Sequence, residues 1–211
     1  MENKQAIEYW RTMASANPNE KTTKVNPVND YSQIDADFIL EYAGKDSDIL
    51  DLASGTGLTI NKFYDKVHHI DAVELFPDFS GFIKDSANIT VINQDVMQFE
   101  TDRKYDIISM FGIVSYFNRK ESVDLYRKYS GLLKPGGKLI VKNQFGITED
   151  VEISGFSEEL QQNYFSQYRH LDKEIKILEE TGYRNVEAFD IYPPECNRWE
   201  NTHFYAIVAE K

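Results

Sequence analysis

Short apolar runs alternate with longer amphipathic stretches through the middle of the chain. Five of these runs have the length and composition of buried strands: residues 48–52, 69–74, 89–93, 105–110 and 138–142. Apolar residues at helical spacing predict helices after three of them, through about residue 64, at 78–86 and at 119–133. Strands that alternate with helices are joined by crossovers, which favours a largely parallel sheet covered on both faces.

The two ends of the chain extend this pattern. Residues 4–14 and 31–43 predict helices on either side of a polar, proline-containing loop, and residues 171–181 predict another helix after a polar, aromatic segment at 143–168. The last two strands, 186–192 and 203–210, have no helix between them and are therefore expected to pair antiparallel. The predicted fold is doubly wound α/β, with a mostly parallel seven-stranded sheet and an antiparallel C-terminal hairpin.

Charge and composition restrict the partners of this domain. The 211 residues carry a formal net charge of −12, and such a surface repels nucleic acid and anionic membranes. Cys196 has no cysteine to pair with, the N-terminus lacks the apolar run of a signal peptide, and we expect a cytoplasmic protein. Adjacent His68 and His69 point to opposite faces of a strand, so no metal site is expected.

The turn after the first strand, Asp51-Leu-Ala-Ser-Gly55-Thr-Gly57, is the first candidate for a ligand site. In doubly wound sheets, ligands bind beyond the carboxyl ends of the strands. Gly55 and Gly57 allow a tight turn and a close approach of the backbone, and Ala53 is also small. A helix after the turn would present free N–H groups to a carboxylate or phosphate. A Gly-x-Gly alone fits a purely structural turn equally well.

Two residues disfavour a dinucleotide at this turn. Ile60 stands where the dinucleotide fingerprint has its third glycine, and Asp51 would repel a pyrophosphate but attract an amine. Further along, Glu74 ends the second strand, where it either accepts hydrogen bonds from ribose hydroxyls or is a solvated acid at the strand end. Asp95 follows the third strand, where it either binds an exocyclic adenine amine or serves as a turn residue.

Five motifs in order make the sequence similar to the class I S-adenosylmethionine-dependent methyltransferase family. They span residues 48–141: the glycine turn, Ala-Val-Glu74-Leu, Asn-Gln-Asp95-Val-Met, Tyr105-Asp-Ile-Ile-Ser-Met-Phe-Gly and Leu-Leu-Lys-Pro-Gly-Gly137-Lys-Leu. Each motif is common, and the ordered set is specific. An NAD-linked oxidoreductase and a catalytically silent cofactor-binding module stay as the alternatives.

The resemblance implies S-adenosyl-L-methionine as cofactor and assigns it a set of residues. The methionyl part would lie near the backbone at Met110 and near the turn residues Asp51, Ala53, Ser54, Gly55 and Gly57. The ribose would bind Glu74, and adenine would lie between Leu75, Val96 and Met97 with Asp95 on its amine. One departure is Ala53, where the family often has glycine.

The resemblance also divides the single domain, residues 1–211, into three parts. Residues 46–142 would bind the cofactor, and residues 143–211 would form the substrate side and the C-terminal hairpin. Residues 1–45 would form a helical lid, in which Tyr9, Trp10 and Tyr31 either close over the cofactor or pack an N-terminal helix on the sheet.

The predicted reaction is methyl transfer to O, N or C of a small-molecule acceptor. A sulfonium methyl group is electrophilic, so the protein mainly has to align the acceptor and exclude water. If a base is needed, the candidate residues are Tyr116, His170 and His203, and Asn143 and Gln144 are placed to bind the acceptor. Arg169 and Arg198, with His170, either form a cationic patch for an anionic metabolite or sugar intermediate or are isolated surface charges.

Overall fold

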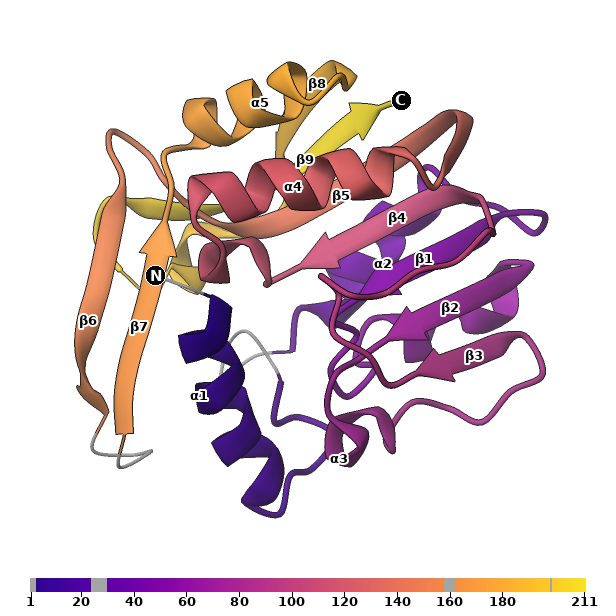
Figure 1. The fold of residues 1–211 in the computed structure, drawn as a ribbon, viewed down its shortest axis with the longest axis horizontal. Coiled ribbons are helices and arrows are strands. Elements are labelled where there is room, and N and C mark those ends of the chain that lie inside the picture. Colours follow the sequence, from indigo (N-terminus) through magenta and orange to yellow (C-terminus); the bar gives the residue numbers. More distant parts are fainter. Residues whose placement is uncertain (1–2, 24–29, 158–161, 198) are drawn as a thin grey trace.

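A seven-stranded sheet forms the centre of the protein, in a computed structural model that describes residues 3–23, 30–157, 162–197 and 199–211. Its strand order is β3-β2-β1-β4-β5-β9-β8 (Figure 1). The strands are β1 (Asp48–Leu52), β2 (His69–Val73), β3 (Ile89–Ile92), β4 (Tyr105–Phe111), β5 (Leu133–Gly146), β8 (Arg184–Asp190) and β9 (Thr202–Glu210). Strands β1 to β5 pair in parallel, and β9 is antiparallel to both β5 and β8, which confirms the predicted fold class.

Helices cover both faces of this sheet. They are α1 (Asn3–Ser15), α2 (Ser32–Leu40), α3 (Pro77–Ser80), α4 (Arg119–Ser130) and α5 (Leu171–Glu180), with 3-10 turns η1 (Ile60–Lys62), η2 (Tyr64–Lys66), η3 (Val114–Tyr116) and η4 (Pro194–Cys196). Alternate residues of each central strand enter different cores. Leu50 and Leu52 pack with residues of α4 and α5, whereas Ile49 packs with residues of α2 and η1.

The prediction of a helix from the glycine turn to residue 64 is wrong. This stretch contains the two short 3-10 turns η1 and η2. Asn61 explains part of the difference, since its side chain donates to the Phe82 carbonyl and accepts from the Lys84 N–H. Those bonds tie the stretch to a neighbouring loop and compete with a regular helix. The helix expected at 78–86 is likewise reduced to the four residues of α3.

The region after β4 also differs from the expectation. Residues 134–137, which separate the predicted helix at 119–133 from the predicted strand at 138–142, lie inside β5, where the register with β4 shifts between Tyr105 and Ile107. The polar segment expected at 143–168 contains the last residues of β5 and a separate hairpin of β6 (Val151–Ser157) and β7 (Gln162–Tyr168). These two strands form a separate two-stranded sheet, and in Figure 1 the hairpin stands beside α1 at one end of the molecule.

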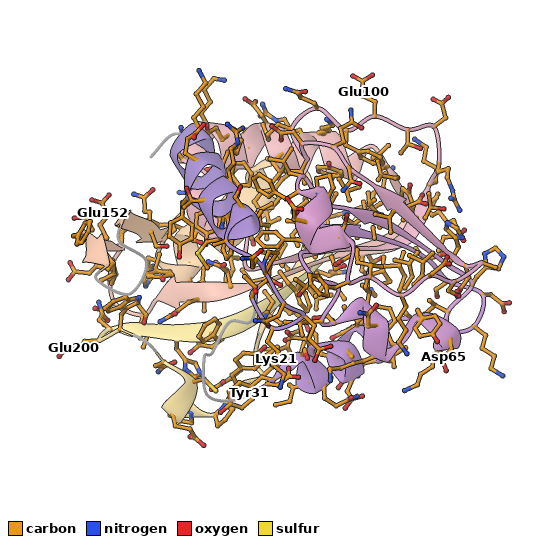
Figure 2. All side chains as sticks on the ribbon, turned by 90° about the horizontal axis from the view of Figure 1, so that it is seen from below. Lys21, Tyr31, Asp65, Glu100, Glu152 and Glu200 are labelled. Carbon is orange, nitrogen blue, oxygen red and sulfur yellow. The ribbon has the colours of Figure 1, made fainter. Side chains whose placement is uncertain are left out.

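Acidic side chains are spread over the surface. Asp65, Glu100, Glu152 and Glu200 are exposed and point outward from different sides of the molecule (Figure 2). Within the described ranges, no helix has the length and apolar character required to cross a membrane.

Candidate active site

The carboxyl ends of β1 to β4 face α1, which lies across this edge of the sheet with the β6–β7 hairpin beside it (Figure 1). A cavity of about 230 Å³ lies at this edge. We call it the main cavity. Its wall includes Ala6, Ile7 and Trp10 of α1, so the N-terminal helix covers the site, as the lid hypothesis requires. The sheet order places residues after β2 and β3 at one end of the cavity and residues of β5, β7 and β9 at the other.

The glycine turn forms the floor of the main cavity through Ala53 and Gly55. Gly55 has φ +56°, and a Cβ on it would lie 2.8 Å from the Thr23 hydroxyl oxygen, so both conformation and space require glycine. Gly57 has φ +74°, and a Cβ there would meet the Ile83 side chain at 2.8 Å. Gly57 therefore serves the packing of the turn, and it is not among the residues lining the cavity.

Ala53 has φ +58°, a left-handed conformation that costs an L-residue about 1–2 kcal/mol. Ala53→Gly should therefore raise the free energy of unfolding by about 1 kcal/mol, after the added flexibility of the unfolded chain is subtracted. Urea denaturation measures the change. Ala188→Gly in the exposed strand β8 is the matched control and should lower stability. An equal loss of unfolding free energy in both variants would contradict backbone strain at Ala53.

Glu74 is buried at the end of β2 and its carboxylate lines the main cavity. One carboxylate oxygen accepts the Gly55 N–H at 2.8 Å, and the other accepts the Phe76 N–H at 2.9 Å. Burial raises the pKa of Glu74, while these backbone donors act in the opposite direction. The two bonds hold the carboxylate in one orientation, and each oxygen keeps lone-pair capacity for a ligand hydroxyl.

Asp51 is buried beneath the glycine turn. Its carboxylate accepts a hydrogen bond from the Ser109 hydroxyl at 2.5 Å. Burial raises the pKa of Asp51 to about 6, and the hydrogen bonds from Ser109 and Ser54 lower it only in part. A cationic ligand group nearby would stabilise the ionised carboxylate.

The remaining predicted cofactor residues fall into two groups. Leu75, Asp95 and Val96 line the main cavity, and the Asp95 carboxylate accepts the Met97 N–H at 2.8 Å, as in a turn. Met97 packs against the core cluster behind this wall. Met110 is fully buried in the same core, and its chain neighbours Phe111 and Gly112 form the wall instead.

A smaller cavity of about 90 Å³ adjoins the main one and shares Thr23, Ala53, Gly55 and Phe111 with it. Asp51, Ser54, Asp35, Lys142 and Tyr192 also line this second cavity. The Lys142 ammonium group lies 2.9 Å from the Asp35 carboxylate and 3.0 Å from the Tyr192 hydroxyl. Our sequence reasoning missed this cluster, although the position of Lys142, directly after the apolar run at residues 139–141, was an available indication.

The end of the main cavity near β5 and β9 is aromatic. The aromatic residues that line this end are Trp10, Tyr116, Phe117, Tyr168 and Phe204, whereas Phe76, Phe79 and Phe111 line the rest of the cavity. The Trp10 ring contacts that of Tyr116 edge-on, with ring centres 6.3 Å apart. Asn143 and Gln144, both buried, add two amide groups to this end of the cavity.

The structure places the other predicted residues away from these walls. His170 begins α5 and its ring Nε2 lies 2.8 Å from the Ile147 carbonyl oxygen. His203 is buried with one ring nitrogen 2.7 Å from Asn197 and the other 2.6 Å from Asp190.

The proposed cationic patch is not assembled by the described residues. The Arg169 guanidinium forms an ion pair with buried Glu174 and donates to the Phe117 carbonyl at 3.1 Å. Arg169 therefore connects α5 to η3 and does not line either cavity. Arg198 lies outside the described residues. Among the residues that are described, no group of three or more His, Cys, Asp and Glu side chains is arranged to hold a metal ion.

Comparison with known proteins agrees with this geometry. Residues 49–137 match the family model described as "Methyltransferase domain", whereas no curated protein matches the chain. The DhpI–SAH complex is 16% identical over 98% of this chain and 95% of its own, with a TM-score of 0.74. A Leishmania major SAM-dependent methyltransferase is 17% identical over 99% and 82%, with a TM-score of 0.75. Burkholderia thailandensis 1,6-didemethyltoxoflavin-N1-methyltransferase, solved with bound 1,6-didemethyltoxoflavin and S-adenosylhomocysteine, is 16% identical over 86% of this chain and 78% of its own, with a TM-score of 0.68.

A mostly parallel sheet with an antiparallel last strand, a glycine turn after β1 and an acidic residue after β2 are features that this chain shares with the methyltransferase fold. Residues 49–137 therefore match a methyltransferase domain, and the chain has the fold of S-adenosylmethionine-dependent methyltransferases. It is a methyltransferase whose methyl donor is S-adenosylmethionine, and this replaces the alternative of an NAD-linked enzyme.

Proposed function

We propose that the enzyme methylates a nitrogen atom of a small, uncharged, planar acceptor bound at the aromatic end of the main cavity. The observation that carries this proposal is the composition of that end: five aromatic rings and two buried amides. Rings of this kind bind flat apolar surfaces, and amides hydrogen-bond polar edges without requiring charge. The proposal narrows the expected set of O, N and C acceptors and departs from the anionic acceptor that the sequence suggested.

The cofactor would occupy the opposite end and the second cavity in this proposal. Glu74 would accept the ribose hydroxyls and Asp95 would accept the adenine amine, with Leu75 and Val96 against the ring. The charged side chains among the described lining residues of the main cavity are Glu74 and Asp95, which leaves neutral groups for the acceptor. The bound donor supplies an electrophilic methyl group on a sulfonium centre.

A neutral nitrogen suits these surroundings because it carries its lone pair near pH 7 without losing a proton first. In this proposal Tyr116 orients the acceptor from η3, next to Trp10 of the covering helix. The structurally similar Burkholderia protein is an N1-methyltransferase crystallised with 1,6-didemethyltoxoflavin, which gives one precedent for a nitrogen acceptor on this fold.

A radiolabelled-methyl assay tests the proposal on matched acceptor pairs. Each pair is a nitrogen heterocycle with and without an added carboxylate or phosphate, and we expect transfer to the neutral member only. Tyr116→Phe keeps the ring and removes the hydroxyl, so we expect kcat to fall about 10-fold, the cost of one orienting hydrogen bond, with the KM for the methyl donor unchanged. Transfer confined to the anionic members would overturn the proposal.

A further inference from the structure

Lys142 is a buried cation beside the glycine turn that the known motifs do not include. Its side chain is 1% exposed, although lysine is among the residues least often buried. The Asp35 carboxylate from α2 and the Tyr192 hydroxyl hold the ammonium group, and Tyr192 also donates to Asp35 at 2.7 Å. The rings of Phe111 and Tyr192 lie 5.1 and 4.9 Å from the ammonium nitrogen.

This cluster fixes the position of the ammonium group. Lysine has three N–H donors, and Asp35 and Tyr192 occupy two of them in two directions. Burying a lysine is costly unless the charge is paired, and the pairing observed here leaves one donor for a further acceptor. Lys142 lines the second cavity, so a ligand group entering that cavity meets the cation.

The second cavity presents charges of both signs. Buried Asp51 lies on its wall together with Lys142, and the shared residues Ala53, Gly55 and Phe111 connect it to the main cavity. The charged residues that line the cavity are Asp30, Asp35, Asp51 and Lys142, of which Asp30 pairs with Lys62 and Asp35 pairs with Lys142. An amino-acid group has an ammonium and a carboxylate on one carbon atom, and Asp51 and the remaining donor of Lys142 offer one partner to each of them. The amine would then pair with Asp51 and the carboxylate with Lys142.

We infer that Lys142, positioned by Asp35 and Tyr192, recognises the α-carboxylate of the cofactor and makes the site selective for an intact amino-acid group. The inference rests on the use of S-adenosylmethionine as methyl donor. It gives the β5 strand a role in cofactor specificity that the glycine turn alone does not supply.

The test compares two ligands by isothermal titration calorimetry: S-adenosylhomocysteine and its decarboxylated analogue, which retains the amine. The wild type should bind the intact ligand about 30- to 100-fold more tightly, as expected for one charge-assisted hydrogen bond. In Lys142→Met combined with Asp35→Asn, which removes both charges of the buried ion pair together, the two affinities should differ by less than about 3-fold. Binding of the decarboxylated analogue itself should change little.

Two further variants keep the test decisive. Lys138→Met changes a lysine of the same strand that pairs with Glu210, away from both cavities, and should retain the wild-type selectivity. Tyr192→Phe keeps the ring and removes one partner of Lys142, so selectivity should fall part of the way. Wild-type selectivity in the Lys142 double variant would overturn this inference alone. A wild type that binds neither ligand would overturn the cofactor assignment and the inference together.

Discussion

Glu74→Gln should weaken binding of S-adenosylhomocysteine about 10- to 100-fold. Both carboxylate oxygens of Glu74 accept backbone N–H groups, from Gly55 and Phe76, and an amide would point its own donor at one of them. The substitution would also remove the charge from the hydrogen bonds that we propose between Glu74 and the ribose hydroxyls, each worth about 1.5–3 kcal/mol. Calorimetric titration measures the loss directly.

The control for this substitution is Glu187→Gln, on exposed strand β8 at the far edge of the sheet. It makes the same chemical change without touching either cavity and should leave the affinity unchanged. Wild-type affinity in Glu74→Gln would show that the ribose does not bind this carboxylate.

Asp51→Asn should stabilise the cofactor-free protein and weaken cofactor binding at the same time. The Asp51 pKa of about 6 means that the folded protein must hold a buried negative charge at neutral pH. Asparagine avoids that cost and still accepts the Ser109 hydroxyl. A difference of about 2 units between folded and unfolded pKa corresponds to about 1–3 kcal/mol of unfolding free energy. The loss of the charge that would pair with the cofactor amine should lower affinity about 10-fold or more.

The stabilisation by Asp51→Asn should increase as the pH rises from about 4 to about 6.5. Between about pH 4 and pH 6 the unfolded chain has ionised Asp51 whereas the folded chain keeps the proton, so wild-type stability falls as pH rises. The two proteins should therefore be equally stable below about pH 4 and differ fully above about pH 6.5. Urea denaturation at pH 4, 5, 6 and 7.5 measures this difference. A constant difference at all four pH values would show that Asp51 is not the titrating group.

Cofactor binding to the wild type should release a proton below about pH 6, because the cofactor amine favours the ionised form of Asp51. Calorimetry at pH 5.5 in two buffers with different ionisation enthalpies detects that proton, and Asp51→Asn should not release it.

The mostly parallel sheet, its antiparallel C-terminal hairpin and the residues expected at the cofactor end of the site were readable from local patterns. Apolar runs alternating with helical periods imply parallel crossovers, and parallel strands carry the residues that follow them to one edge. Glu74, Asp95 and the glycine turn therefore had to lie near one another, whatever the details of the helices. The left-handed backbone at Ala53 follows from the same turn, although an alanine gives no local sign of it.

The sequence by itself thus determined the fold class, the resemblance to methyltransferases and the residues expected at the nucleoside end, because these depend on periodicity and on short, ordered motifs. Only the tertiary structure joined Lys142 to Asp35, 107 positions earlier, and brought Trp10 against Tyr116 over the acceptor end. It also showed that Arg169 forms an ion pair with Glu174 and that the ring nitrogens of His203 contact Asp190 and Asn197. Such pairings depend on how distant segments pack, and a charged residue looks the same in sequence whether it meets a ligand or a structural partner.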